Sequence, residues 1–413
     1  MIKIPTYKKI SGMVTSLCRG GAERQMLYLL DNNVISDLYL LENKIEYDVD
    51  IEKLKSIKPV ILNKKIKFHL LKYFLLPFYL FKFSKKIGKN SSIISFEGAN
   101  IVNVFSKLLV KHKSIISVLS NPQINYRGLK CLLFPIIKIV YIFSDMIITN
   151  SKGVAEFLKG SNSLKNKVFT LYNPISIDFI KSKYKEPLSN EEKELFNNHP
   201  TFITVGRLTG AKGQWNLLRV FKKVKEILVD AKLIIVGDGE LGDCLISLSK
   251  GLGLKTFINF DSQSKINSNY DVYFLGSQEN PFKYIYNSSI FVFPSIREGF
   301  PNVILEALAC QIPIISADCR FGPREILAPE TDFNYETKTP EYCSYGVLMP
   351  VLYNKKKTTQ KLFSKEEIIW SDTIVSLYRD KEVSNNFINK SMEGVKNFDV
   401  ELIIPMWKKL LNN

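Results

Sequence analysis

The sequence predicts an α/β protein built from two parallel sheets. Three observations lead to this fold class: short apolar runs recur along the chain, longer helical patterns mostly separate them, and a polar segment divides the series in two. At about 100 to 200 residues per domain, the 413 residues have room for two or three domains. A hydrophobic share of 46% with 23% charged residues excludes a disordered chain.

Nine runs predict strands, because each is rich in β-branched or aromatic residues and is bounded by turn residues. In chain order they cover residues 92–96, 114–119, 146–149, 168–171, 201–205, 232–236, 272–274, 290–293 and 313–316. An earlier apolar run at 13–17 leads into a loop with Gly20 and Gly21 that opens a helix.

The domain boundary is expected between Asn173 and Pro200, where residues 185–192 are polar and no strand candidate occurs. The expected organisation is therefore a first domain over 1–175, a linker over 176–200, a second domain over 201–385 and a C-terminal helical segment over 386–413.

The excess of basic residues lies in the first domain. The formal net charge is +17, and residues 1–175 hold 27 Lys and Arg against 11 Asp and Glu, while the remainder holds 30 against 29. Between residues 53 and 144 there are 17 basic residues and one acid, Glu97. Such a surface favours a polyanionic partner, either nucleic acid or an anionic membrane leaflet.

Two apolar stretches within the basic region favour the membrane. Residues 70–82 are too short and interrupted for a span of about 20 apolar residues, and they predict an amphipathic element in the headgroup region. Residues 126–143 are a second candidate, and an ordinary core helix with a solvated basic face is the alternative for both. No signal peptide is expected. The lysines that flank the first stretch are Lys64, Lys65, Lys67, Lys85, Lys86 and Lys89.

Metal chemistry is not expected. The six cysteines form no CxxC pair, as in a reduced cytosolic chain, and the three histidines are far apart in sequence. The acid pair Asp48 and Asp50 lies in a charged segment and is interpreted as solvated surface.

The stretch 294–309 carries the strongest chemical signal. Pro301 stands where a helix would begin, and the free N–H groups of its first turn suit an anion such as phosphate. Glu306 interrupts an otherwise apolar helix, so it needs donors such as hydroxyl groups unless it reaches solvent or a structural arginine.

The loop 205–213 follows a predicted strand and contains Arg207 and Lys212, which could clasp a diphosphate, although such a loop is often just solvated. Gly237 and Gly239, after the next strand, are interpreted as glycines that the backbone of the turn requires, because the full dinucleotide-binding fingerprint is missing.

Together these stretches resemble the retaining glycosyltransferases of family 4, which have the GT-B architecture of two facing Rossmann-like domains. The resemblance rests on residues 20–24, on 205–207 with 212–213, on 236–239, and on the E-x7-E spacing from Glu298 to Glu306. Residues 321–327 and 346–350 are similar to the bacterial surface-polysaccharide branch of that family.

The resemblance implies roles for particular residues. Arg207 and Lys212 would hold the diphosphate, Glu306 would bond the ribose, and Glu298 would orient the donor sugar. The catalytic residues would be Glu298, Arg207 and Lys212, and the loop 276–281 would lie near the base. The further donor-binding residues carried over are Gly20, Gly21, Gly299, Phe300, Pro301 and Asn302. The C-terminal helix would cross back to the first domain.

The implied reaction is transfer of a hexose or N-acetylhexosamine from a nucleotide sugar, most simply a UDP-sugar, to a lipid-linked glycan, with retention and without metal or cofactor. The protein would act in bacterial capsule or O-antigen synthesis on the cytoplasmic side of an anionic membrane, without nucleic acid. Many relatives place a histidine where this chain has residues 118–122, so Ser120 and Asn121 are the acceptor-side candidates.

Three alternatives stay open. The protein could be a soluble transferase with a small acceptor, a basic nucleic-acid-binding module, or an inactive GT-B scaffold. The nucleic-acid module would leave the diphosphate-binding pattern unexplained, and the scaffold would leave the complete set Arg207, Lys212, Glu298 and Glu306 unexplained.

Overall fold

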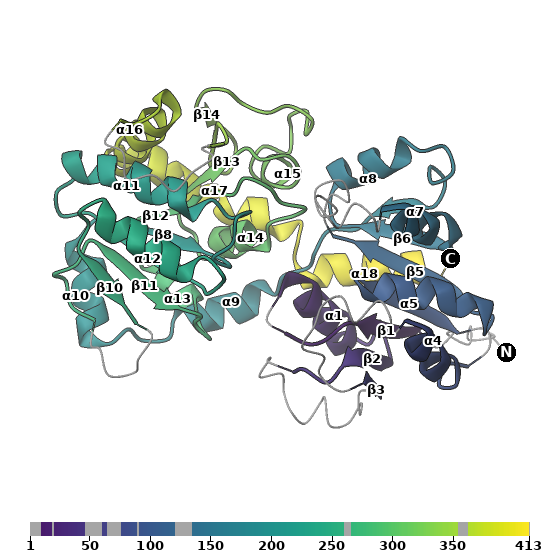
Figure 1. Ribbon diagram of the computed structural model, residues 1–413. Helices are drawn as coiled ribbons and strands as arrows, with labels where there is room; N and C mark the ends of the chain where they lie inside the picture. Colours follow the sequence, from purple (N-terminus) through teal and green to yellow (C-terminus); the bar gives the residue numbers. More distant parts are fainter. Residues whose placement is uncertain are drawn as a thin grey trace. The chain divides into compact units, whose positions relative to one another are not determined.

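The computed structural model describes residues 10–18, 20–45, 60–63, 76–88, 91–119, 134–259, 266–353 and 362–412. The chain forms two compact units. The first comprises residues 1–174 and 400–413, and the second comprises residues 175–399. Both are α/β units with a largely parallel sheet (Figure 1), so the predicted fold class is confirmed.

The first unit contains a seven-stranded sheet in the order β3-β2-β1-β4-β5-β6-β7, with parallel pairing throughout. Its strands are β1 (Ile10–Val14), β2 (Asp37–Glu42), β3 (Val60–Asn63), β4 (Ser92–Phe96), β5 (Lys113–Val118), β6 (Met146–Thr149) and β7 (Val168–Thr170). Its helices are α1 (Gly21–Asp31), α4 (Leu76–Ser84), α5 (Ala99–Phe105), the short 3-10 turn η1 (Ser106–Leu108), α7 (Phe134–Phe143), α8 (Lys152–Lys159) and α18 (Val400–Asn412).

The second unit contains an eight-stranded sheet in the order β10-β11-β9-β8-β12-β13-β15-β14, in which the β14–β15 pair is antiparallel. Its strands are β8 (Thr201–Val205), β9 (Lys232–Val236), β10 (Thr256–Ile258), β11 (Val272–Gly276), β12 (Ile290–Phe293), β13 (Ile314–Ala317), β14 (Glu341–Tyr342) and β15 (Val347–Met349). Its helices are α9 (Ile177–Tyr184), α10 (Asn190–Asn198), α11 (Gln214–Ile227), α12 (Gly242–Gly251), α13 (Phe282–Tyr286), α14 (Asn302–Ala309), α15 (Pro323–Leu327), α16 (Lys365–Arg379) and α17 (Lys381–Lys396).

All nine predicted strands are present, each with its ends within two residues of the expected ones. The first strand, β1, covers Ile10–Val14 and therefore begins before the apolar run at 13–17. Five further strands, β2, β3, β10, β14 and β15, were not expected. β2 begins and ends in acidic residues, Asp37 and Glu42, which are uncommon in strands, and parallel pairing with β1 holds it in the sheet.

The region 176–200, expected as a linker, instead forms α9 and α10 of the second unit. Its polar composition reflects a capped helix start: the Ser189 hydroxyl accepts from the Glu192 N–H, and the Glu192 carboxylate accepts from the Ser189 N–H. Glu192 is buried and also accepts a hydrogen bond from the Tyr284 hydroxyl at 2.6 Å. Polarity therefore marked a helix N-terminus rather than an unstructured connection.

The expected C-terminal segment, 386–413, is divided between the two units. α17 belongs to the second unit, where Phe387 is buried in its core. α18 belongs to the first unit and buries Ile403, Ile404 and Trp407 in the same cluster as Met26 and Ile115. The last helix thus completes a core that begins near residue 14.

Candidate active site

The predicted donor-site residues of the second unit lie near the point where the strand order of its sheet reverses. From β8 the chain first builds β9, β11 and β10 on one side, and β12 then pairs with β8 on the other side. The carboxyl ends of strands at such a switch point form the usual ligand crevice of α/β sheets. Lys212 follows β8 and Glu298 follows β12, so both lie beside this point.

Lys212 and Glu298 form an ion pair. The Lys212 Nζ donates to Glu298 Oε1 at 2.6 Å, and the Ser295 hydroxyl donates to the same oxygen at 2.6 Å. The Glu298 side chain is 11% exposed and that of Lys212 is 21% exposed. One carboxylate oxygen is therefore held by two donors, while Oε2 receives no hydrogen bond from the described residues.

Ser295 lies within the stretch 294–309 but was not predicted to be a site residue. It is fully buried, directly after Pro294 at the end of β12, and its position three residues before Glu298 lets its hydroxyl reach back to that carboxylate. The signal available in sequence was this short spacing between a hydroxyl and a carboxylate in a loop after a strand.

The two loops are locked together by their backbones. The Ile296 N–H donates to the Ala211 carbonyl at 2.8 Å. Gly213 has φ +67°, and a Cβ there would lie 2.2 Å from the Pro294 carbonyl oxygen. Glycine is therefore required both for the left-handed conformation and for the close approach. This contact fixes Lys212 next to the β12 loop.

Arg207 lies in the same loop as Lys212, but its side chain is exposed and its carbonyl accepts from Gln214 Nε2 at 3.1 Å. Gly237 supports this loop from β9, because a Cβ there would lie 2.1 Å from the Gly206 carbonyl oxygen. A side chain at position 237 would thus clash with the backbone of the neighbouring loop, which explains why a glycine stands there.

Beyond Glu298, residues Gly299–Asn302 lead into α14. Pro301 caps the helix in an extended conformation, and Asn302 is its first residue. A Cβ on Gly322, in the loop after β13, would lie 2.4 Å from Pro301 Cδ, so this loop packs against the start of α14. Glu306 is buried in the second turn of α14 at 7% exposure, and Phe300 is likewise buried at 6%.

Burial, reinforced by the negative charge of Glu298, raises the pKa of the Cys319 thiol well above its ordinary value. Cys319 is 2% exposed and follows β13. The thiol therefore stays protonated at neutral pH and supplies no charge to the site.

Arg324, in the stretch that resembles the polysaccharide branch, has a structural position. Its guanidinium donates to Asp318 Oδ2 at 2.6 Å and to Glu341 Oε2 at 2.7 Å, and its side chain is 4% exposed. Hydrogen bonds from Arg324 lower the pKa of the Glu341 carboxyl. Arg324 thus links the loop after β13 to β14 and has a structural role.

Three further groups of predicted residues are the loop 276–281, the glycines at the start of the first unit, and the positions outside the described part of the chain. In the loop 276–281, Asn280 donates to the Lys183 carbonyl and to Glu186, which ties the loop to the end of α9. Gly20 and Gly21 lie at the start of α1 in the first unit. Ser120 and Asn121, Asp48 and Asp50, and the parts 70–75 and 126–133 of the amphipathic stretches lie outside the described residues.

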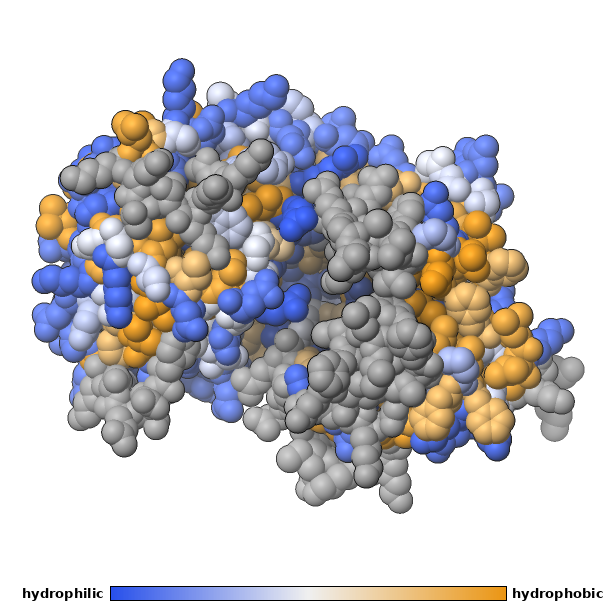
Figure 2. All heavy atoms as spheres, in the orientation of Figure 1, coloured by the Kyte–Doolittle hydropathy of each residue, from blue (hydrophilic) through white to orange (hydrophobic). Residues whose placement is uncertain are grey.

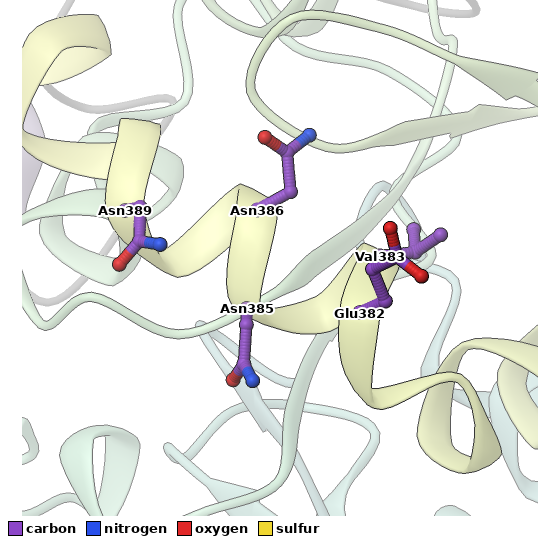
Figure 3. Close-up of a pocket in the computed structure, with 5 residues that line it drawn as sticks. All are labelled: Glu382, Val383, Asn385, Asn386 and Asn389. Carbon is purple, nitrogen blue, oxygen red and sulfur yellow. The ribbon is translucent and has the colours of Figure 1, made fainter.

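Figure 3 shows a separate hollow along α17, lined by Glu382, Val383, Asn385, Asn386 and Asn389. Asn385 and Asn386 point in opposite directions, so their amides do not converge on one ligand (Figure 3). Among the described residues, no three His, Cys, Asp or Glu side chains come together as a metal site. None of the helices described is both long and apolar enough to span a membrane.

Comparisons with known proteins identify the family of the chain. Residues 186–342 match the family model of glycosyl transferases group 1. An uncharacterised glycosyltransferase of Methanocaldococcus jannaschii is 34% identical, over 88% of this chain and 89% of that protein. The N-acetylgalactosamine-N,N'-diacetylbacillosaminyl-diphospho-undecaprenol 4-alpha-N-acetylgalactosaminyltransferase of Campylobacter jejuni is 28% identical, over 87% of this chain and 97% of that protein.

A solved structure extends the likeness to the fold. The crystal structure of Anabaena HepE in complex with UDP and glucose is 16% identical and covers 98% of this chain and 99% of its own, with a TM-score of 0.71. The likeness covers both units and identifies the GT-B fold. The family model and the 34% identical relative show that the chain belongs to the group 1 glycosyltransferases.

Proposed function

We propose that the protein is a retaining glycosyltransferase that moves a hexose or N-acetylhexosamine from a UDP-sugar to a lipid-linked glycan in bacterial polysaccharide synthesis. The observation that carries this proposal is the built cluster of Lys212, Glu298 and Ser295 at the switch point of the second sheet. The named acceptor of the Campylobacter relative, a diphospho-undecaprenol glycan, supports the acceptor class.

In this proposal, departure of the nucleoside diphosphate builds negative charge, and Lys212, Arg207 and the first N–H groups of α14 stabilise it. Fixed cations supply that stabilisation, so the proposal includes no metal and no cofactor. The unbonded Oε2 of Glu298 accepts a hydroxyl of the donor sugar, and Glu306 bonds the ribose. Glu298 thus orients the sugar, and the acceptor attacks on the face from which the diphosphate leaves.

A surface of the first unit supports peripheral binding to an anionic membrane. α4 contacts η1 and α5, and α5 contacts α7. Orange side chains gather over these elements in Figure 2. Lys85 Nζ lies 4.1 Å from the ring centre of the exposed Phe81, and Lys82 lies 4.4 Å from that of Phe78. The exposed members of this apolar basic face are Phe78, Phe81, Leu108, Leu109, Ile136, Ile139, Ile142, Phe143, Lys82, Lys85, Lys86 and Lys138.

Apolar side chains with interspersed lysines fit a headgroup region, where the lysines meet anionic lipid. The face belongs to the basic first half of the chain, so charge complementarity favours an anionic leaflet as its binding partner. We place the protein at the cytoplasmic surface of the membrane for this reason, where a polyprenyl-linked acceptor would be anchored.

The transfer reaction tests the proposal. The protein is incubated with each of four donors: UDP-galactose, UDP-glucose, UDP-N-acetylgalactosamine and UDP-N-acetylglucosamine. The acceptor is either the diphospho-undecaprenol glycan named for the Campylobacter relative or, for the soluble alternative, a simple glycoside. Lys212→Ala and Glu306→Ala are expected to lose about 100-fold or more of the turnover while keeping the fold. Lys250→Ala and Glu382→Gln, which are exposed elsewhere in the second unit, are the controls. Unchanged turnover in both site variants would overturn the site assignment, and transfer to simple glycosides alone would favour the soluble alternative.

A further inference from the structure

The turn after β4 holds Glu97 in a strained backbone conformation. Among the described residues, four that are not glycine have a positive φ: Asn33, Glu97, Gln311 and Phe321. Asn33 and Gln311 directly follow the C-caps of α1 and α14, where a left-handed residue is the ordinary helix ending. Phe321 is 4% exposed and packed. Glu97, with φ +54°, neither ends a helix nor buries its side chain.

Glu97 lies at the switch point of the first sheet. From β1 the chain builds β2 and β3 on one side, and β4 then pairs with β1 on the other side. The equivalent place in the second unit, between β8 and β12, holds Lys212 and Glu298. In each unit a glutamate thus follows the strand that begins the second half of the sheet, at the edge where α/β sheets bind ligands.

Buried hydrogen bonds hold the turn in place. The Asn100 N–H donates to the Glu97 carbonyl at 3.1 Å, and its side-chain amide donates to the Ser117 carbonyl at 2.9 Å. The Ser95 hydroxyl donates to Asn100 Oδ1 at 2.8 Å. Asn100 therefore joins the ends of β4 and β5 to the strained residue, so the surroundings maintain a conformation that the Glu97 side chain disfavours.

The chemistry of the place points to a sugar hydroxyl. Glu97 is the single acid among 17 basic residues between 53 and 144, and a carboxylate opposes the binding of a polyanion. An ionised carboxylate only accepts hydrogen bonds, which suits a hydroxyl donor. A Cβ on Gly98 would lie 3.2 Å from Thr15 Oγ1, so a second hydroxyl-bonding group stands beside the turn.

From these observations we infer that Glu97, with Thr15 beside it, binds a hydroxyl group of the acceptor sugar in the first unit. The inference rests on the proposed function, because it names the residue that receives the acceptor. The strained turn then serves to present this carboxylate at the sheet edge.

The test separates the carboxylate from the backbone strain. Glu97→Gln removes the charge at nearly constant size, and Glu97→Gly removes the strain as well. The matched control is Gln311→Gly, which relieves the same backbone conformation at the end of α14. Both glycine variants are expected to unfold at or above the wild-type temperature. Transfer to the diphospho-undecaprenol glycan is expected to fall by about tenfold or more in both Glu97 variants, through the acceptor KM, and to stay unchanged in Gln311→Gly.

Hydrolysis of the UDP-sugar by water provides the internal comparison. It is expected to change less than about twofold in Glu97→Gln, because the donor site lies in the second unit. Equal losses of hydrolysis and transfer, or full transfer in both Glu97 variants, would overturn the inference. If wild type transfers nothing, the proposed function fails. The inference is then decided by ligand-observed NMR with methyl glycosides of the four sugars in saturating UDP: a signal that Glu97→Gln abolishes supports it, and the absence of any Glu97-dependent signal overturns it.

Discussion

At the scale of the residue, the two glutamates of the E-x7-E pattern have different environments. Glu298 is anchored through one oxygen by Lys212 and Ser295, whereas Glu306 is buried within α14. The sequence predicted Lys212 from its loop and Glu306 from its place in an apolar helix, whereas the role of Glu298 came from the resemblance to family 4. It did not predict that Lys212 and Glu298 touch, because they are 86 positions apart and meet only through the pairing of β8 with β12.

Ser295→Ala is expected to lower turnover by about 10- to 100-fold, since a hydrogen bond to a charged group contributes about 1.5 to 3 kcal/mol. The nucleotide Kd is expected to stay close to wild type, because Lys212 remains in place. The measurement is kcat alongside UDP titration. Ser316→Ala is the control, since Ser316 is equally buried on the neighbouring strand and bonds only a backbone carbonyl among the described residues. Equal effects of the two substitutions would contradict a specific role of Ser295.

At the scale of the element, strands in the middle of each sheet were the most predictable from sequence. β12 is a continuous apolar run, and only Thr201, Thr204 and Lys232 interrupt the apolar runs of β8 and β9, as expected of strands buried on both faces. The edge strands β3, β10 and β14 carry a weaker pattern, because fewer neighbours bury them. The polar segment before β8 was mistaken for a linker, because a capping box and a solvent-facing helix have the composition of a loop.

The C-terminal helix α18 is part of the first core rather than an appendage. Trp407 is fully buried there, and burial of a tryptophan contributes about 3 to 5 kcal/mol relative to alanine. Trp407→Ala is therefore expected to destabilise the first unit selectively. Hydrogen exchange should show faster exchange at β1, β4 and β5 with β8 and β9 still protected.

Met406→Ala is the matched control, because the neighbouring Met406 is 46% exposed and its truncation removes little buried area. Loss of protection in β8 and β9 to the same degree as in β1 would contradict the assignment of α18 to the first unit.

At the scale of the whole molecule, charge is divided unevenly between the two halves of the chain. Residues 1–175 carry nearly all of the net +17, and the second unit is almost neutral but keeps Lys212 and Arg207 at the sheet edge. Composition alone predicted a polyanionic partner for the entire chain. The elements α4, η1, α5 and α7 form one apolar basic face, and the proposed function places an anionic membrane there. The sequence alone could not assemble this face, because strands separate its elements.

Charge reversal on that face is expected to release the protein from vesicles that contain anionic phosphatidylglycerol. Each lysine near an anionic surface contributes about 1 kcal/mol, so Lys85→Glu, Lys86→Glu and Lys138→Glu together are expected to weaken binding by about 100-fold. The measurement is cosedimentation at fixed salt. The control is an equal charge change on exposed lysines of the second unit, made with Lys193→Glu, Lys250→Glu and Lys381→Glu. Equal release by both triple variants would show that net charge alone determines vesicle binding, which would contradict a specific role of this face.

The central claim is that the cluster around Lys212 binds the donor nucleotide by its own cations. Isothermal titration of UDP into the full chain, in excess EDTA and again in Mg²⁺, measures this most directly. We expect saturable binding with the same Kd in both buffers, weakened by about tenfold or more in Lys212→Ala and unchanged in Lys250→Ala. Binding that requires Mg²⁺, or binding that Lys212→Ala leaves intact, would contradict it.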